Sequence, residues 1–88
     1  MLNKNSKNAA GTITGMITPA TWDDDGTVVS VMIKANQHDS YLVEHNPSGQ
    51  ELIAFVNKKT EASGRIRNRL DGRTLIHIRD YIILDEPL

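Results

Sequence analysis

The chain has 88 residues, 39% of them hydrophobic, and its ten basic and eleven acidic residues give a formal net charge of −1. This length allows one domain with a small core, because so short a chain buries only about 60–65% of its unfolded surface. The absence of cysteine excludes disulfides and thiolate zinc sites. The near-neutral charge excludes a global attraction to nucleic acid or anionic lipid, so any basic surface has to be local.

The first ten residues contain no apolar run of the kind found in signal peptides or membrane anchors. We therefore expect residues 1–10 to form a disordered tail, and we expect no membrane insertion. A native start of this kind would leave the protein in the cytoplasm, whereas removal of a preceding leader would place it in the periplasm. The compartment stays open.

Period-two alternation over Gly11–Thr18 predicts a first strand with Ile13, Gly15 and Ile17 on its inner face. A glycine inside a strand indicates a sharp bend or a close backbone neighbour. We expect the following segment, Pro19–Gly26, to be a loop.

Two runs rich in β-branched residues predict a second strand over Thr27–Lys34 and a third over Ser40–His45. The connection over 35–39 is too short for a crossover, so these strands should form an antiparallel hairpin.

The sequence period changes after the third strand. Ser48 followed by Glu51 fits a capping box, and apolar residues then recur at helical spacing. We expect one short helix over 48–56 that ends at Asn57 and Lys58. A strand over 52–56 remains an alternative, because short apolar runs are ambiguous by periodicity alone.

Asp71-Gly72 is a strong hairpin signal, because a primed turn needs positive φ at both central residues and Asp and Gly reach it cheaply. The turn separates a fourth strand over Lys59–Asn68, again with a glycine in its middle, from a fifth that runs from Arg73 to about Leu84. Residues 85–88 should form a C-terminal tail.

Five strands, a short helix between the third and fourth, and glycines in the first and fourth resemble the oligonucleotide/oligosaccharide-binding (OB) fold, an all-β, five-stranded Greek-key barrel. The resemblance covers Gly11–Leu84. Three segments carry it: Gly11-Thr12-Ile13-Thr14-Gly15, Glu61-Ala62-Ser63-Gly64-Arg65-Ile66 and Ile76-His77-Ile78-Arg79-Asp80-Tyr81. With them the chain looks like small bacterial single-barrel proteins. The resemblance implies a ligand surface on the outside of strands two and three and on the loops joining strands one to two and four to five.

The first functional hypothesis is weak binding of single-stranded nucleic acid. Alternate residues of a strand point to one face, so the arginines of the fourth strand and the hairpin could form a phosphate-contacting stripe. The candidate cations are Lys34, Arg65, Arg67, Arg69, Arg73 and Arg79. Trp22 or Tyr41 would supply stacking, which contributes about 1–3 kcal/mol per base. A lone tryptophan could equally cap the core.

A simpler interpretation of the arginines is electrostatic pairing within the protein. The loop between strands one and two is acidic, with Asp23, Asp24 and Asp25. If it faces the arginine-rich hairpin across one rim, the two loops pair, and such exposed pairs contribute only ~0–1 kcal/mol.

The second hypothesis is a protein-interaction or self-association surface on strands two and three. Pairing Ile33 with Tyr41 buries an all-apolar set and leaves Met32 and Leu42 outside as an apolar strip. A one-residue slip would instead expose Tyr41 and bury Glu44, so we prefer the first register. We expect a monomer, and a small-ligand or sugar site beside the tryptophan is a third possibility.

Neither metal binding nor catalysis is indicated. The three consecutive aspartates lack the alternating spacing of a calcium loop. His38, His45 and His77 share no ligand spacing. No glycine-rich phosphate loop or nucleophile elbow is present, so we expect a non-catalytic protein without a cofactor.

Overall fold

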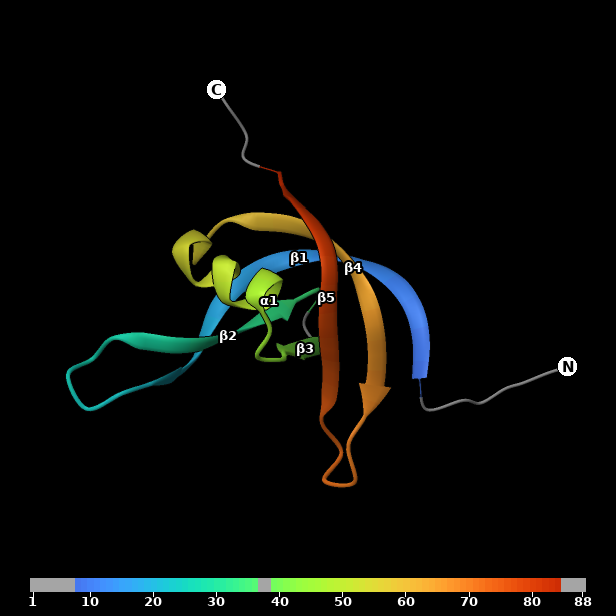
Figure 1. The fold of residues 1–88 in the computed structure, drawn as a ribbon, viewed down its shortest axis with the longest axis horizontal. Helices are drawn as coiled ribbons and strands as arrows, with labels where there is room; N and C mark the ends of the chain where they lie inside the picture. Colours follow the sequence, from blue (N-terminus) through green and yellow to red (C-terminus); the bar gives the residue numbers. More distant parts are fainter. Residues whose placement is uncertain (1–7, 37–38, 85–88) are drawn as a thin grey trace, which may run out of the picture.

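Five strands close into a barrel in the order β1-β2-β3-β5-β4, as Figure 1 shows. The computed structural model describes residues 8–36 and 39–84, so the tails expected over 1–7 and 85–88 lie outside the described residues. The elements are β1 (Asn8–Trp22), β2 (Val28–Lys34), β3 (Ser40–Val43), α1 (Pro47–Glu51), the 3₁₀ helix η1 (Leu52–Phe55), β4 (Lys59–Asn68) and β5 (Thr74–Ile83). No helix in the described ranges is long and apolar enough to span a membrane.

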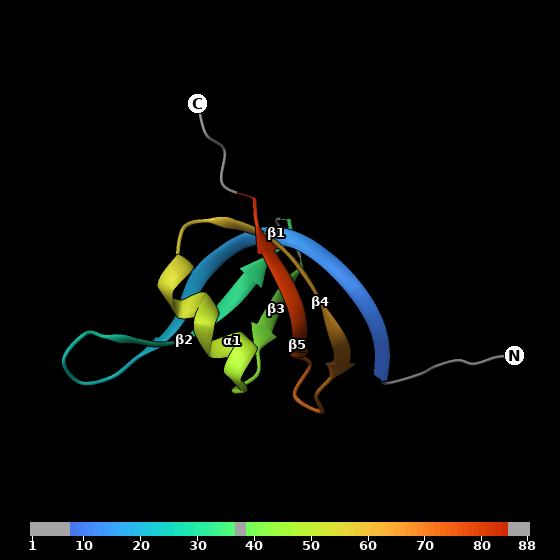
Figure 2. The same ribbon diagram turned by 45° about the horizontal axis from the view of Figure 1, so that its top comes forward.

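The expected all-β, OB-like barrel with a short helix between strands three and four is confirmed. Neighbouring strands are antiparallel, except for β3 and β5, which are parallel. The long strand β1 pairs with β4 through its first half and with β2 through its second half, and both pairings include Met16. This shared strand bends around the core and joins the two halves of the barrel (Figure 2).

The barrel interior is filled by aliphatic side chains from alternate strand positions and by Leu52 of η1. The core cluster consists of Ile13, Ile17, Val31, Ile33, Val43, Leu52, Ala62, Ile76 and Ile78. Two glycines let backbones approach closely, as the sequence indicated. A Cβ at Gly15 would lie 2.5 Å from the carbonyl oxygen of Lys34, and one at Gly64 would overlap the carbonyl oxygen of His77.

The first strand is longer than predicted at both ends. It begins at Asn8, so residues 8–10 belong to the strand rather than to a tail, and it continues through Pro19 to Trp22, where a loop was expected. Pairing with β4 ends at Met16, and Ile17 donates to the Lys58 carbonyl on that side. The nitrogen of Pro19 faces the same edge by alternation, beyond the end of β4, so proline costs no ladder hydrogen bond there.

The N-cap of α1 lies two residues before the predicted cap. Asn46, not Ser48, is the N-cap, and its side chain accepts a hydrogen bond of 3.0 Å from the Gly49 amide, with Pro47 opening the first turn. The chain continues as η1, so the alternative of a strand over 52–56 is wrong. Asn57, with φ 74°, ends the helical segment as predicted.

A hydrogen bond ties the end of α1 to β5. The Tyr81 hydroxyl donates to Glu51 Oε1 at 2.7 Å, and this bond raises the pKa of Tyr81 above its usual value. The Tyr81 ring also packs against Phe55, with ring centroids 6.3 Å apart. Together with the completely buried Leu52, these contacts hold the helical segment against the barrel.

Candidate nucleic-acid interface

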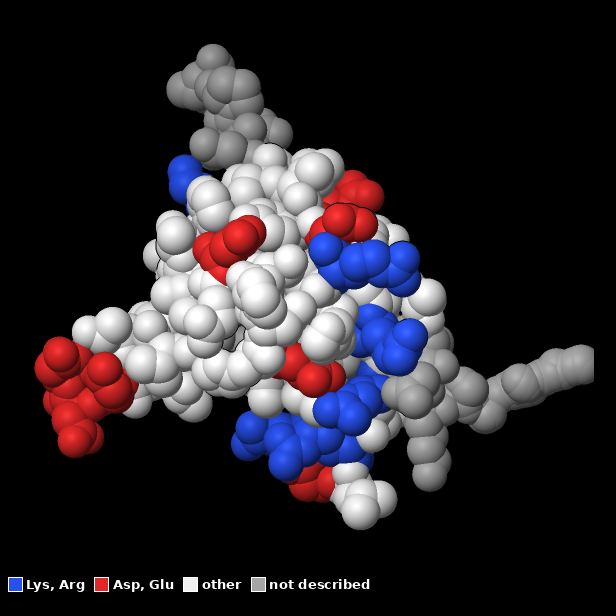
Figure 3. Space-filling view, in the orientation of Figure 1, with Lys and Arg blue, Asp and Glu red and all other residues white. Residues whose placement is uncertain are grey.

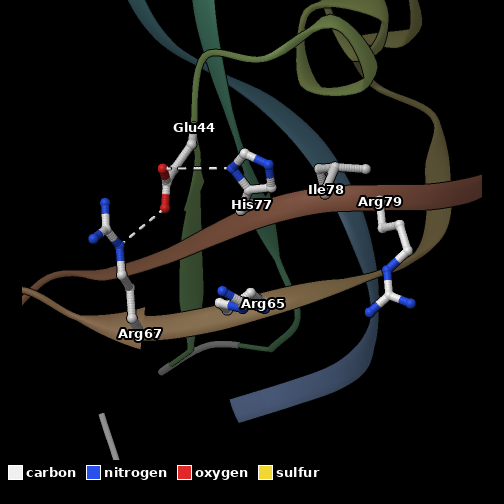
Figure 4. Close-up of a pocket in the computed structure, with 6 residues that line it drawn as sticks. All are labelled: Glu44, Arg65, Arg67, His77, Ile78 and Arg79. Carbon is white, nitrogen blue, oxygen red and sulfur yellow. Dashed lines mark hydrogen bonds and ion pairs between the residues drawn. The ribbon is translucent and has the colours of Figure 1, made fainter. Parts of the chain in front are cut away.

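The outer face of β4 and β5 gathers the basic side chains of the protein. Arg65 and Arg67 alternate on β4 and His77 and Arg79 on β5, and all four are exposed. Together with Glu44 and Ile78 they line an open depression of about 630 Å³. Figure 3 shows Lys and Arg residues running down this side of the molecule, and Figure 4 shows the lining residues. We call this depression the basic depression.

A β-bulge brings Arg79 into the basic depression. Ser63 pairs with Asp80, but Gly64 pairs with Ile78, so Arg79 is an extra residue on β5. Both Arg79 and Asp80 are exposed as a result, which interrupts strict alternation. Bulges of this kind re-aim side chains, and the close approach at Gly64 is part of the same irregularity.

The charges in the basic depression are only partly paired. Arg67 Nε donates to Glu44 Oε2 at 3.1 Å, and Glu44 Oε1 lies 3.8 Å from His77 Nδ1, as the dashed lines in Figure 4 show. Arg65 and Arg79 form no ion pair with any residue of the described ranges. Two guanidinium groups are therefore available to an external anion, while a third is engaged by Glu44.

The β4–β5 turn adds two more arginines beside a single carboxylate. Arg69 and Arg73 lie 3.8 Å and 4.0 Å from Asp71 Oδ2, so the turn keeps a net positive charge. The expected two-residue primed turn is wrong, because only Gly72 has positive φ, at 91°. Hydrogen bonds from Gly72 to Arg69 and from Arg69 to Arg73 close a three-residue loop with glycine in the left-handed position.

The acidic loop does not neutralise these arginines. Asp23 and Asp25 accept hydrogen bonds from amides within their own turn, including that of Thr27. Hydrogen bonding with the Asp23 side chain and with Thr27 lowers the pKa of Asp25 to about 2. No ion pair within the described ranges joins residues 23–25 to an arginine, and the β1–β2 and β4–β5 hairpins project in different directions (Figure 1). The pairing of the two loops across one rim is therefore wrong.

The two aromatic candidates lie outside the basic depression. Trp22 is 57% exposed at the end of β1, opposite Val28, so it does not cap the core. Tyr41 pairs with Ile33, which confirms the preferred register, and it packs against the core cluster. Lys34 is exposed and pairs with Ser40, one strand away from the residues of β5.

A second depression of about 480 Å³ lies on the outer face of β2 and β3. Met32, Leu42 and Arg73 are among its lining residues. This face adjoins the basic depression. Across the neighbouring strands β2, β3, β5 and β4, Met32 pairs with Leu42, Leu42 with Leu75, and Leu75 with Arg67. Met32 and Leu42 thus lie on this outer face as predicted, but both are half-buried, and the adjoining Leu75 is only 7% exposed.

Two residues of the basic depression, Glu44 and His77, were not predicted as site residues. His77 alternates with Ile76 and Ile78, so its outward direction could have been read from the period of the strand. Glu44 meets His77 only because β3 and β5 pair in parallel, which no local signal reports.

No metal site is evident: residues 8–36 and 39–84 contain no group of three or more potential metal-ligating side chains. His38 lies outside the described residues, and His45 bonds Gln50 at 3.0 Å. Comparison with protein-family models found no match, and neither the curated proteins nor the solved structures gave one.

Proposed function

We propose that this protein is a non-catalytic OB-type module that binds single-stranded nucleic acid weakly through the basic depression. The observation that carries the proposal concerns Arg65 and Arg79, which lie on one outer face beside a partly engaged Arg67. Their guanidinium groups form no ion pair with any described residue. Guanidinium groups bind phosphate bidentately and remain charged at every physiological pH.

The spacing of the arginines suits an extended polyanion. Alternate positions on a strand lie about 6.6 Å apart, so Arg65 and Arg67 present a short linear series of cations that continues into the β4–β5 turn. A single strand can follow such a series with its flexible backbone, and residues 8–36 and 39–84 contain no long helix that could enter a duplex groove. The likeness of the barrel to the OB fold adds support by analogy only.

The same surface explains why binding should be weak and nearly independent of sequence. Trp22 and Tyr41 do not line the basic depression, so the bases have no aromatic platform there and phosphate contacts dominate. Such binding weakens steeply as salt rises, with a slope of about −0.7 in log K against log[salt] per phosphate contacted.

A pair of variants tests the proposal. Arg65→Ala combined with Arg79→Ala should weaken binding of a labelled single strand of about 12 nucleotides and reduce the salt slope by roughly 1 to 2. Lys59→Ala, which removes an exposed cation at the other end of β4, should change neither value appreciably. A loss of affinity from Lys59→Ala equal to half or more of the loss from the two arginine replacements would overturn the proposal, because it would mean that each charge counts equally wherever it lies.

The second candidate function is docking of a protein on the outer face of β2 and β3. The neighbouring, half-buried Met32 and Leu42 on this face favour it, since adjacent apolar side chains on an outer face mark interaction surfaces. Leu42→Lys should then abolish capture of a protein partner while leaving oligonucleotide affinity unreduced. If the combined Arg65→Ala and Arg79→Ala variant captures less of the protein partner while Leu42→Lys captures as much as the wild type, the partner docks on the basic depression instead.

A further inference from the structure

The first half of β1 has a strand neighbour on one edge only. β1 pairs with β4 from Asn8 to Met16, but it pairs with β2 only from Met16 onwards. Within the described ranges, residues 8–15 therefore have no strand on the edge opposite β4. In both ribbon views this half of β1 borders the sheet, with β4 on one side (Figures 1 and 2).

Alternation identifies the backbone groups on this free edge. Ile17 donates to Lys58 and accepts from Asn57, both on the β4 side, so the odd-numbered residues of β1 bond towards β4. The N–H and C=O groups of Ala10, Thr12 and Thr14 then face the free edge. All three residues are exposed, so these groups are open to another strand.

Nothing in the sequence of this edge opposes strand pairing. Natural proteins protect edges with charged residues, proline or bulges. Residues 8–15 contain no charged residue and no proline, and the pairing with β4 has no bulge.

We propose that this edge pairs antiparallel with the same edge of a second copy of the chain, so that two barrels share one sheet with β1 at its centre. Placing the two-fold axis at Thr12 sets Thr12 opposite Thr12 of the second copy, and Ala10 opposite Thr14 of the second copy. All three residues of each copy then exchange hydrogen bonds, about six in total.

Charge complementarity favours a second copy over another occupant. On β4, Arg65 pairs with Ala10 and Glu61 pairs with Thr14. In the dimer, one cross-strand row therefore runs from Arg65 through Ala10 to Thr14 and Glu61 of the second copy, and symmetry repeats it. Neither Arg65 nor Glu61 forms an ion pair within the described ranges of one chain. Arg65 and Glu61 of the second copy then lie three strand spacings apart, about 14 Å between their backbones, with only the small side chains of Ala10 and Thr14 between them. The proposal does not depend on nucleic-acid binding.

Sedimentation equilibrium on the full chain, from about 10 μM to about 1 mM, tests the dimer. The wild type should self-associate. Thr12→Lys and Thr12→Glu each place like charges directly opposite one another and should be monomeric alone, whereas an equimolar mixture should form a heterodimer. Thr27→Lys adds the same charge to the exposed β1–β2 loop and should leave the dimer intact.

Three results would overturn the proposal: a monomeric wild type throughout this range, a dimer unaffected by Thr12→Lys, or a mixture of the two variants that stays monomeric. If circular dichroism shows that the charged variants do not fold, Thr12→Pro replaces them. Proline removes the N–H on the free edge and none that bonds to β4, so it should abolish the dimer of a folded protein.

Discussion

Glu44→Gln should strengthen nucleic-acid binding, although it alters a residue inside the proposed site. The Glu44 carboxylate lies 3.1 Å from Arg67 and 3.8 Å from His77, so it occupies a position that a phosphate oxygen would otherwise take. Glutamine keeps the size of the side chain and removes its negative charge. The variant therefore frees Arg67 and ends the repulsion between Glu44 and an incoming phosphate.

The expected magnitude follows from the exposure of the pair. The Arg67 side chain is 51% exposed and that of Glu44 21%, so the pair itself contributes only ~0–1 kcal/mol. An anion that no longer competes with Glu44 should bind more tightly by up to that amount, which is up to roughly fivefold. One additional phosphate contact should also steepen the salt slope by about 0.7.

Fluorescence anisotropy of a labelled single strand, measured at several salt concentrations, gives both values. Asp24→Asn is the matched control, because it removes the same charge from the exposed tip of the β1–β2 hairpin. Unchanged or weaker binding by Glu44→Gln would refute the reasoning, as would equal tightening by Asp24→Asn.

Three further predictions concern stability. Gly64→Ala should lower the free energy of unfolding by about 3 kcal/mol or more in urea titrations, because the new Cβ overlaps a β5 carbonyl. The control Gly26→Ala, which lies in open space with φ 88°, should lower it by only about 1 kcal/mol. Equal losses in the two variants would contradict the packing argument. The pKa of Asp25 is lowered from 3.8 to about 2, so its contribution to folding stability is present above pH 3.8 and is lost as pH falls towards 2. Asp25→Asn should therefore reduce the change of the melting temperature with pH over that interval. A variant with the same acid profile as the wild type would contradict the assignment. Tyr81→Phe should lower the free energy of unfolding by about 0.5–1.5 kcal/mol. It should also remove a loss of stability that begins above pH 10 in the wild type, since the pKa of Tyr81 is raised in the folded state. A variant as stable as the wild type in chemical denaturation would show that the bond is dispensable.

The strands were predictable where local pattern and tertiary contacts agree. The expected fourth strand has the bounds of β4, Lys59–Asn68, because alternation and the preceding turn residues mark it. Pro19 misled the prediction of β1, since its tolerance depends on where β4 stops pairing. The Asn46 cap could have been recognised from the following Pro47, a residue favoured in the first helical turn.

The candidate site was predictable only in part. The outward direction of Arg65 and Arg67 follows from the period of their strand, and both line the basic depression. Glu44 is close to Arg67 through the parallel pairing of β3 with β5, and Arg79 enters through a bulge. Both are non-local features of the closed barrel, so residue types along the chain do not report them.

The central claim is that Arg65 and Arg79 form the contact surface for single-stranded nucleic acid. The most direct test is an NMR titration of isotope-labelled protein with a mixed-sequence single strand. At low salt, shifts should cluster on Arg65, Arg67, His77 and Arg79, leave the β1–β2 hairpin around Trp22 unchanged, and shrink at physiological salt. Absence of shifts at about millimolar oligonucleotide, or shifts confined to the hairpin around Trp22, would contradict the account.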